Sequence, residues 1–600
     1  MRLLRTGAAV AAALLAPATL VPLAAAHADP AAYTVTTLHF KVTVGPTSSK
    51  TCDIVGDLYT PAGAGPTDRM PAILTTNGFG GSKNDQAGIG KAFSQQGYVV
   101  LSYSGLGFGG SSCAVTLDDP DYDGKAGSQL ISYLGGKSGI AYLDAAHKQP
   151  APVLDDVELD GPDDPRVGTI GGSYGGSNQF AIADVDPRLD TIVPMITWND
   201  LSYSLGPNNT DQVAPGAVST TDPGSVKLLW AAGFSIDGME ADISNKQVPD
   251  LPCPNFATWV CPALVTGATT GFLDKGTIAH LRHASVASYM QNIKVPTLLI
   301  QGENDTLFNL NEAAATYRAL KAQGTPVQMI WQSWGHSSLT PATGEIDMSS
   351  PDPATQYETA RISDWFAHYL KGESSVSTGP DFAYYRDWVS YTGDAAPAYA
   401  SASSFPVGSD QVWRLSGKGS LVTGSTPSAA GSQSLVTPVA GLPTSLANID
   451  ALSAFIGTPP NIPGDLPGTE VQWDSPALTA PVDVVGSPRV TLKVGAPTAA
   501  LTQALGPAGQ VVLMIRVADV GPDGKATLIH GLEAPVRVPN VNKPFTVTVP
   551  AIVHRFAAGH KIRLEVAGGS IDYRGNLLAT PVSIASGATQ TLTLPTVPAS

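Results

Sequence analysis

The sequence has little charge, few cysteines and, after its first 30 residues, no long apolar run. Charged side chains make up 14% of the 600 residues, and 50 Asp and Glu outnumber 34 Lys and Arg, for a formal net charge of −16. An acidic surface repels phosphate backbones, so no nucleic-acid partner is expected. No later run approaches the roughly 20 apolar residues that a membrane-spanning helix requires, so no membrane span is expected.

The first residues form the one apolar stretch that needs an explanation. Arg2 and Arg5 precede an Ala- and Leu-rich segment, and Ala26-His27-Ala28 has the small-x-small pattern of a cleavage site. This arrangement is typical of a secretory signal peptide. We therefore expect residues 1–28 to be removed after Ala28 and the protein to be secreted.

The four cysteines, an even number, fit an oxidising compartment. Four cysteines allow three sets of pairs. Of these we favour Cys52–Cys113 together with Cys253–Cys261, the second of which closes the short loop CPNFATWVC.

The pattern of apolar residues changes near residue 375. Before it, continuous apolar strands such as PAILTTN, YVVLSYS and TLLIQG alternate with amphipathic helical segments, which predicts a parallel sheet covered on both faces over residues 29–375. An aromatic-rich insertion at about 199–292 interrupts the series and is interpreted as a cap over a binding site. Residues 376–600 are expected to form a second domain, which from about residue 405 onward reads as short strands separated by Gly, Pro, Asn and Asp turns and so indicates an all-β sandwich or jelly roll.

The most informative motif is GGSYG, with Ser173 at its centre. A lone G-x-S-x-G is weak evidence in a chain with 62 glycines, but here it follows the strand RVGTIGG and precedes a helical segment. That context is the one a nucleophile elbow requires, because the tight strand-to-helix turn holds the serine hydroxyl clear of the sheet. We therefore predict that Ser173 is a nucleophile.

A nucleophilic serine needs a base and an orienting carboxylate, which follow in the order Asp or Glu and then His in this class of enzyme. Asp305 lies just after the strand 297–302, and His336 lies just after the strand 327–333. Both should therefore reach the same edge of the sheet as Ser173. Glu303 is the only close rival to Asp305. The expected catalytic set is Ser173, Asp305 and His336.

The oxyanion of the reaction should be held by two backbone N–H groups. One is that of Tyr174, directly after the nucleophile, and the other comes from the loop after PAILTTN, where Phe79 is our candidate.

Three other motifs match sites of known chemistry less well. GLGFGG follows a strand but opens no helix, so the phosphate-binding context is missing. Asp119, Asp121 and Asp123 match the first half of a calcium loop, but position twelve is Leu130 rather than Glu. His280 and His283 have a spacing that could suit a metal, without an evident third ligand. No metal and no cofactor are expected.

Taken together, DDPRVGTIGGSYGG, GENDTLF, WGHSS and HRFAAGHKIRLEVAGGS resemble the peptidase S15 and cocaine-esterase-like hydrolases, the Xaa-Pro dipeptidyl-peptidase family. The resemblance implies an α/β-hydrolase core with a helical cap and a C-terminal jelly roll, with Ser173, Asp305 and His336 in the catalytic positions. Two positions depart from the family: Phe79 stands where a tyrosine hydroxyl is common, and YSGLGFGGS lacks the usual arginine of that turn.

The sequence thus predicts a secreted serine hydrolase that cleaves a small-molecule or peptide acyl substrate. Ester, amide and Xaa-Pro peptide bonds stay open, and a dipeptidyl peptidase would need a carboxylate for the free amine, for which Asp237 or Glu240 are candidates. An acyltransferase that uses the same three residues is one alternative. A non-catalytic surface or polysaccharide-binding protein is another. The oligomeric state is not predicted.

Overall fold

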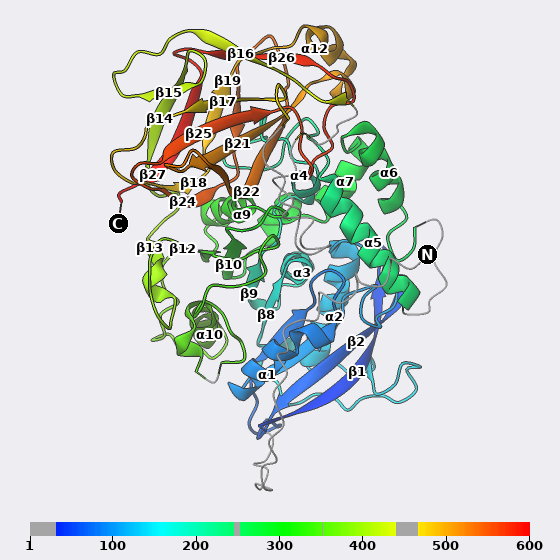
Figure 1. The fold of residues 1–600 in the computed structure, drawn as a ribbon. Helices are drawn as coiled ribbons and strands as arrows, with labels where there is room; N and C mark the ends of the chain where they lie inside the picture. The colour runs from blue at the N-terminus through cyan, green and yellow to red at the C-terminus, as the bar shows by residue number, and fades with distance from the viewer. Residues whose placement is uncertain (1–31, 245–252, 351, 440–443, 445–465, 600) are drawn as a thin grey trace, which may run out of the picture.

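The computed structural model of the chain describes residues 32–244, 253–350, 352–439, 444 and 466–599. Over these residues it has an α/β part followed by an all-β part, which lies at the top of Figure 1. The predicted signal peptide, residues 1–28, lies outside the described residues.

The first sheet is mostly parallel. Neighbours from β4 through β3, β8, β9, β10 and β11 to β12 run parallel, and β1 and β2 form an antiparallel pair beside β4. Counting only the described residues, it has eleven strands, in this spatial order: β13 (Tyr399–Ala402), β12 (Phe382–Tyr385), β11 (Val327–Gln332), β10 (Thr297–Gly302), β9 (Leu189–Met195), β8 (Val167–Gly172), β3 (Ala72–Thr76), β4 (Val99–Tyr103), β2 (Lys50–Pro61), β1 (Tyr33–Val44) and β5 (Ala141–Tyr142).

Helices cover both faces of this sheet, which explains why its central strands β3, β4, β10 and β11 are buried along their whole length. Along β10, Leu298 and Ile300 join the core on one face and Leu299 joins the core on the other. On the first face Phe93 of α1 packs edge-on against Phe366 of α10, with ring centroids 5.3 Å apart. The helices of the first face are α1 (Ala87–Gln95) and α10 (Tyr357–Tyr369), and those of the second are α2 (Lys125–Leu134), α3 (Tyr174–Val185) and α9 (Leu310–Ala322).

The first sheet continues beyond the change of pattern near residue 375. Phe382, in β12, is the parallel partner of Met329 in β11, and β13 then pairs antiparallel with β12. Burial of Phe382 and Ala383 in the two cores explains why this segment stays with the α/β part. The first sheet therefore extends two strands beyond residue 375.

Between β9 and β10 the chain leaves the sheet and forms a group of helices, here called the cap. They are α4 (Leu201–Leu205), α5 (Leu228–Ser244), α6 (Val260–Thr270), α7 (Lys275–His283) and α8 (Val286–Tyr289). In Figure 1 the helices α5, α6 and α7 lie at the right, beside the lower edge of the C-terminal domain. No described helix combines the length and apolar character that a bilayer span requires.

The C-terminal domain is all-β, as the sequence predicts, and has its own apolar core. Trp473, Leu564 and Val566 are fully buried in it, and inward and outward residues alternate along β25, as expected of strands buried on one face. Its strands are β14 (Ser409–Ser416), β15 (Ser420–Thr423), β16 (Gly431–Val436), β17 (Glu470–Asp474), β18 (Val482–Gly486), β19 (Arg489–Leu492), β20 (Val494–Gly495), β21 (Val512–Val520), β22 (Ala526–Arg537), β23 (Phe545–Thr548), β24 (Ile552–Phe556), β25 (Lys561–Ala567), β26 (Pro581–Ser586) and β27 (Thr591–Val597).

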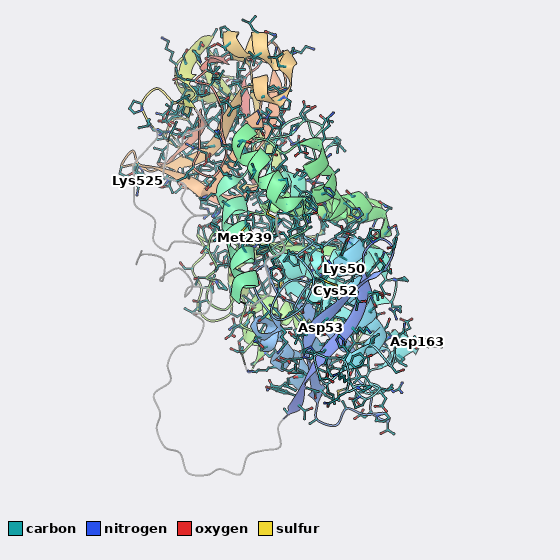
Figure 2. The ribbon with its side chains drawn as sticks, turned by 90° about the vertical axis from the view of Figure 1, so that its right-hand side faces the viewer. Lys50, Cys52, Asp53, Asp163, Met239 and Lys525 are labelled. Atoms are coloured by element: carbon teal, nitrogen blue, oxygen red, sulfur yellow. A yellow bond between two sulfur atoms is a disulfide. The ribbon has the colours of Figure 1, made fainter. Side chains whose placement is uncertain are left out.

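The C-terminal domain holds the cap in place through buried polar contacts. The Arg537 guanidinium donates to the carbonyl oxygens of Gly224 and Gly271, each at 3.1 Å through Nη2. Arg574 Nε donates to the Ala268 carbonyl at 2.9 Å. In the side view of Figure 2, Met239 of α5 lies between Lys525 of the C-terminal domain and Cys52 of the first sheet. The cap therefore rests on both domains.

Candidate active site

Ser173 lies on the sharp turn between β8 and α3. Its backbone adopts φ 57° and ψ −119°, a conformation that is costly for a residue with a side chain. Its N–H donates to the Met195 carbonyl of the neighbouring strand at 2.9 Å, which fixes the turn. Gly175 permits the tight approach of α3, because a Cβ at this position would lie 2.4 Å from the Thr76 carbonyl oxygen.

His336 lies between Ser173 and Asp305. Its Nε2 is 2.8 Å from Ser173 Oγ, and its Nδ1 is 2.6 Å from Asp305 Oδ2. A carboxylate only accepts, so Nδ1–H donates to Asp305 and Nε2 is left to accept from the serine hydroxyl. The three side chains come from the ends of β8, β10 and β11, as their positions after strands predict.

The Asp305 carboxylate is fully buried and its second oxygen is satisfied by backbone. Oδ1 accepts from the N–H of Leu307 at 3.0 Å and from that of Phe308 at 2.7 Å. The rival Glu303 is also buried, but burial raises its pKa above the usual range and it has no contact with His336 among the described hydrogen bonds. The arrangement therefore pairs the imidazole with Asp305.

Lys227, in the cap, is hydrogen-bonded to the loop that carries Asp305. This residue was not identified from the sequence. Its Nζ donates to the carbonyl oxygens of Thr306 and Leu307 at 2.7 and 2.8 Å, and the residue is 1% exposed. Burial lowers the pKa of Lys227 to about 8. The sequence does single out Lys227 in one respect, because it is the sole basic residue between Arg188 and Lys246.

The candidate oxyanion donors lie beside the nucleophile. Tyr174 N begins α3, and Gly78, next to Phe79, would place a Cβ 3.8 Å from that of Ser173. In the described part of the chain, the backbone hydrogen bonds include none donated by the N–H of Tyr174 or Phe79. The Phe79 ring stacks against Phe256 of the cap, with centroids 6.0 Å apart, so the side chain itself supplies apolar surface and no donor.

An apolar pocket opens beside Ser173, between the sheet edge and the cap. Two of its polar side chains are bonded within the cap: Ser235 Oγ donates to the Ala231 carbonyl, and Thr277 Oγ1 donates to Asp274. The lining combines aromatic and aliphatic residues of both parts, namely Phe79, Leu117, Ser173, Tyr174, Trp198, Leu201, Leu205, Val226, Ala231, Phe234, Ser235, Phe256, Trp259, Val260, Ala263, Leu264, Leu273, Thr277, Leu281 and Phe308.

Both disulfides join the cysteines that the sequence analysis paired. Cys52 on β2 is bonded to Cys113, and Cys253 is bonded to Cys261 at the start of α6. The second bond closes the loop that carries Phe256 and Trp259 into the pocket. It therefore restrains part of the cap wall.

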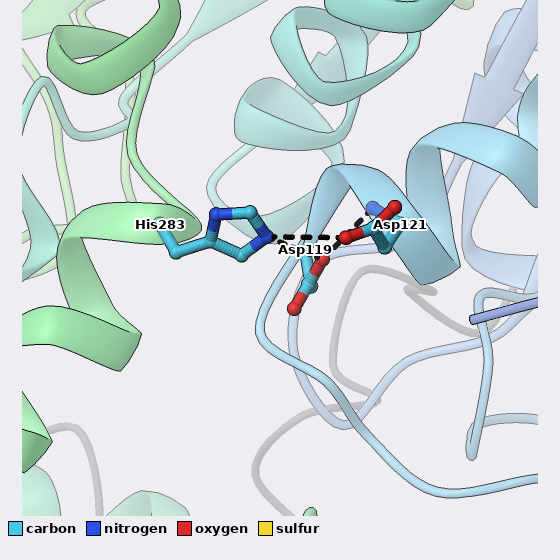
Figure 3. Close-up of side chains that lie close together, drawn as sticks. All are labelled: Asp119, Asp121 and His283. Carbon is cyan, nitrogen blue, oxygen red and sulfur yellow. Dashed lines mark hydrogen bonds and ion pairs between the residues drawn. The ribbon is translucent and has the colours of Figure 1, made fainter. Parts of the chain in front are cut away.

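Asp119, Asp121 and His283 meet where the cap touches the core (Figure 3). His283 Nε2 of α7 lies 3.3 Å from Asp119 Oδ1 and 3.5 Å from Asp121 Oδ2, and hydrogen bonding to Asp119 raises the pKa of His283. Asp121 also pairs with Lys125 at 2.8 Å. Asp123, third of the half calcium motif, instead bonds to Thr116. The contact joins cap and core and is an ion pair when His283 is protonated.

The remaining candidates lie on the cap helices α5 and α7. The His280 ring stacks on that of Trp259, with centroids 4.8 Å apart. The Asp237 carboxylate lies against Gly80, outside the pocket lining, and the side chain of Glu240 is outside the described part of the chain.

Comparisons with known proteins agree with this architecture. A model described as "X-Pro dipeptidyl-peptidase (S15 family)" matches residues 51–338, and one described as "X-Pro dipeptidyl-peptidase C-terminal non-catalytic domain" matches residues 387–580. No curated protein matches the chain significantly.

Three solved structures share the fold over nearly the whole chain. An aminopeptidase from the marine sediment archaeon Thaumarchaeota archaeon has a TM-score of 0.64 at 12% identity and covers 97% of this chain and 99% of its own. An α-amino acid ester hydrolase has a TM-score of 0.60 at 15% identity, covering 96% and 98%. A CocE/NonD family hydrolase from Staphylococcus aureus has a TM-score of 0.60 at 13% identity, covering 93% and 94%.

Proposed function

We propose that this chain, which belongs to the X-Pro dipeptidyl-peptidase (S15) family, is a secreted serine hydrolase that cleaves ester or amide bonds through an acyl-enzyme. The observation that carries the proposal is the continuous contact from Asp305 through His336 to Ser173, at 2.6 and 2.8 Å. Such a contact lets the imidazole accept the serine proton while the carboxylate stabilises the resulting positive charge.

The reaction follows from these contacts. His336 Nε2 takes the proton from Ser173 Oγ as the oxygen attacks the substrate carbonyl carbon. The negative charge that forms on the carbonyl oxygen is held by the N–H groups of Tyr174 and Phe79. His336 then gives its proton to the leaving oxygen or nitrogen, and water, activated in the same way, releases the acyl group from the serine.

Secretion is supported by the leader-like first 28 residues and by two disulfides, which persist in oxidising compartments. N-terminal sequencing of protein recovered from the culture medium should begin at Asp29. A start at Met1 in exported protein would contradict cleavage after Ala28.

Acyl transfer is a second candidate. The pocket beside Ser173 is apolar and covered by the cap, and a dry site slows attack of water on an acyl-enzyme. An alcohol supplied to the acyl-enzyme would then compete with water. Formation of an ester product when an alcohol is added to the assay separates this function from hydrolysis.

The proposal is tested by the hydrolysis of p-nitrophenyl acetate with the purified mature protein. We expect a burst of p-nitrophenol followed by steady turnover, and a loss of roughly 10⁴-fold or more in kcat for Ser173→Ala and for His336→Ala. Val265→Ala, on the exposed side of α6 at 63% exposure, is the matched control and should retain full activity. Full activity in Ser173→Ala would overturn the assignment.

A further inference from the structure

The pocket beside Ser173 indicates which kind of acyl group the enzyme accepts. We propose, on the basis of the serine hydrolase function proposed above, that the substrate is an ester of an uncharged, aliphatic acyl chain, with the chain buried under the cap. Among the described residues, no Asp, Glu, Lys, Arg or His lines this pocket.

The pocket lies on the acyl side of the scissile bond. His336 must protonate the leaving group, so that group lies on the His336 side of the nucleophile. His336 does not line the pocket, although its neighbours Ser173 and Phe308 do. A chain that enters the pocket from the carbonyl carbon on Ser173 therefore belongs to the acyl part of the substrate.

Four polar side chains of the pocket wall are hydrogen-bonded within the protein. The Tyr174 hydroxyl accepts from the Asp118 N–H at 3.1 Å, and the Trp198 indole donates to the Ala284 carbonyl at 3.1 Å. Ser235 and Thr277 are bonded within the cap, as described above. A substrate ammonium would lose its water and find no carboxylate here, whereas each buried methylene gains about fourfold in binding.

The wall has room for a chain because small residues of two cap helices face it. Ala231 of α5 and Ala263 of α6 line the pocket. The lining also includes aliphatic side chains, among them Leu205 of α4, Leu273 of the α6–α7 connection and Leu281 of α7. Such an aliphatic surface suits a flexible hydrocarbon chain more than a charged peptide.

Two substrate comparisons test the proposal. With a fixed alcohol, kcat/KM for p-nitrophenyl octanoate should exceed that for p-nitrophenyl acetate by about tenfold or more, since six added methylenes enter the pocket. In a pH-stat assay, methyl octanoate should be cleaved at least about tenfold faster than methyl 2-aminooctanoate, which differs only by the ammonium. Preference for acetate, or for the amino ester, would overturn the proposal.

Two variants of one helix link the preference to the pocket. Ala231→Phe fills the cavity and should remove the octanoate preference while p-nitrophenyl acetate is still cleaved. Ile236→Phe, also on α5 but 60% exposed and outside the lining, should leave both rates unchanged. If Ala231→Phe still prefers the octanoate ester, the acyl chain binds outside this pocket and the proposal is contradicted.

The amine-anchor alternative has its own measurement. If Asp237 or Glu240 binds a substrate amine, the double variant Asp237→Asn/Glu240→Gln should lose activity on the amino ester or on Ala-Pro-p-nitroanilide, and such a selective loss would also contradict an uncharged acyl substrate. Acetate hydrolysis that depends on Ser173 reports on the proposed function separately. If the protein hydrolyses p-nitrophenyl acetate through Ser173 but does not prefer the octanoate ester, the proposed substrate class is refuted and the proposed serine hydrolase function is not.

Discussion

Replacing Gly175 by alanine tests whether catalysis requires close packing between the turn at Ser173 and β3, the strand that leads to the loop of Phe79. The new Cβ would lie 2.4 Å from the Thr76 carbonyl oxygen and 3.1 Å from that of Asn77. Thr76 pairs with Tyr103 of β4 and follows a residue paired with β8, so the strand cannot easily give way. Restoring an ordinary contact of 3.4 Å requires a displacement of 3.4 − 2.4, about 1 Å, between α3 and β3.

Two terms oppose one another in the stability of this variant. Overpacking costs about 1–3 kcal/mol, whereas alanine in a helix gains about 1 kcal/mol over glycine. The net loss of unfolding free energy is thus only about 0–2 kcal/mol. The catalytic effect is larger, because a shift of about 1 Å separates Ser173 from the Phe79 N–H, and losing one oxyanion donor lowers kcat by about 10²–10³.

The matched control is Gly172→Ala, on the other side of the same serine. A Cβ at Gly172 meets only the flexible side chain of Ile196, at 3.6 and 3.8 Å, which is ordinary contact. We expect kcat for p-nitrophenyl acetate to change less than about twofold in Gly172→Ala and to fall about 10²-fold in Gly175→Ala. Equal activity of the two variants, at similar melting temperatures, would refute the reasoning.

Other contacts give further predictions. Lys227→Met leaves the carbonyl oxygens of Thr306 and Leu307 unpaired, at about 1–3 kcal/mol each, and should lower kcat about tenfold with KM nearly unchanged; an unchanged kcat would remove Lys227 from the positioning of Asp305. Burial raises the pKa of Glu312 from 4.5 to about 7, so the folded state binds its proton more tightly and stability is lost as the pH rises from about 4.5 to 7. Glu312→Gln removes the titrating group, so this loss of about 3 kcal/mol in unfolding free energy should disappear when thermal unfolding is measured at a series of pH values. An unaltered pH dependence would show that Glu312 does not cause the loss. Replacing Cys52 and Cys113 by serine opens a loop of 61 residues and should lower the unfolding free energy by about 4 kcal/mol. The same change at Cys253 and Cys261 opens a loop of 8 residues and should lower it by about 2.5 kcal/mol. If the second variant has the lower melting temperature, loop entropy does not dominate.

The candidate catalytic set could be read from the sequence because each residue lies in the loop just after an apolar strand. Strand position and chain order place Ser173, Asp305 and His336 at one edge of a parallel sheet without any knowledge of side-chain packing. The β pattern of residues after 405 is equally local, since turn residues separate strands of period two.

Contacts between distant segments could not be predicted in the same way. Lys227 reaches the Asp305 loop across 79 residues, and Arg537 reaches Gly224 across 313, because the cap folds back between two domains. The meeting of His283 with Asp119 has the same origin. Sequence spacing carries no signal for such pairs, whereas the tertiary packing of the cap determines them.

The most direct measurement of the central claim is labelling with a fluorophosphonate followed by peptide mapping. The account predicts stoichiometric modification of Ser173 in the folded wild-type protein, no label in Ser173→Ala, and slow labelling in His336→Ala because the base is missing. Label on another residue, or label that persists in Ser173→Ala, would contradict it.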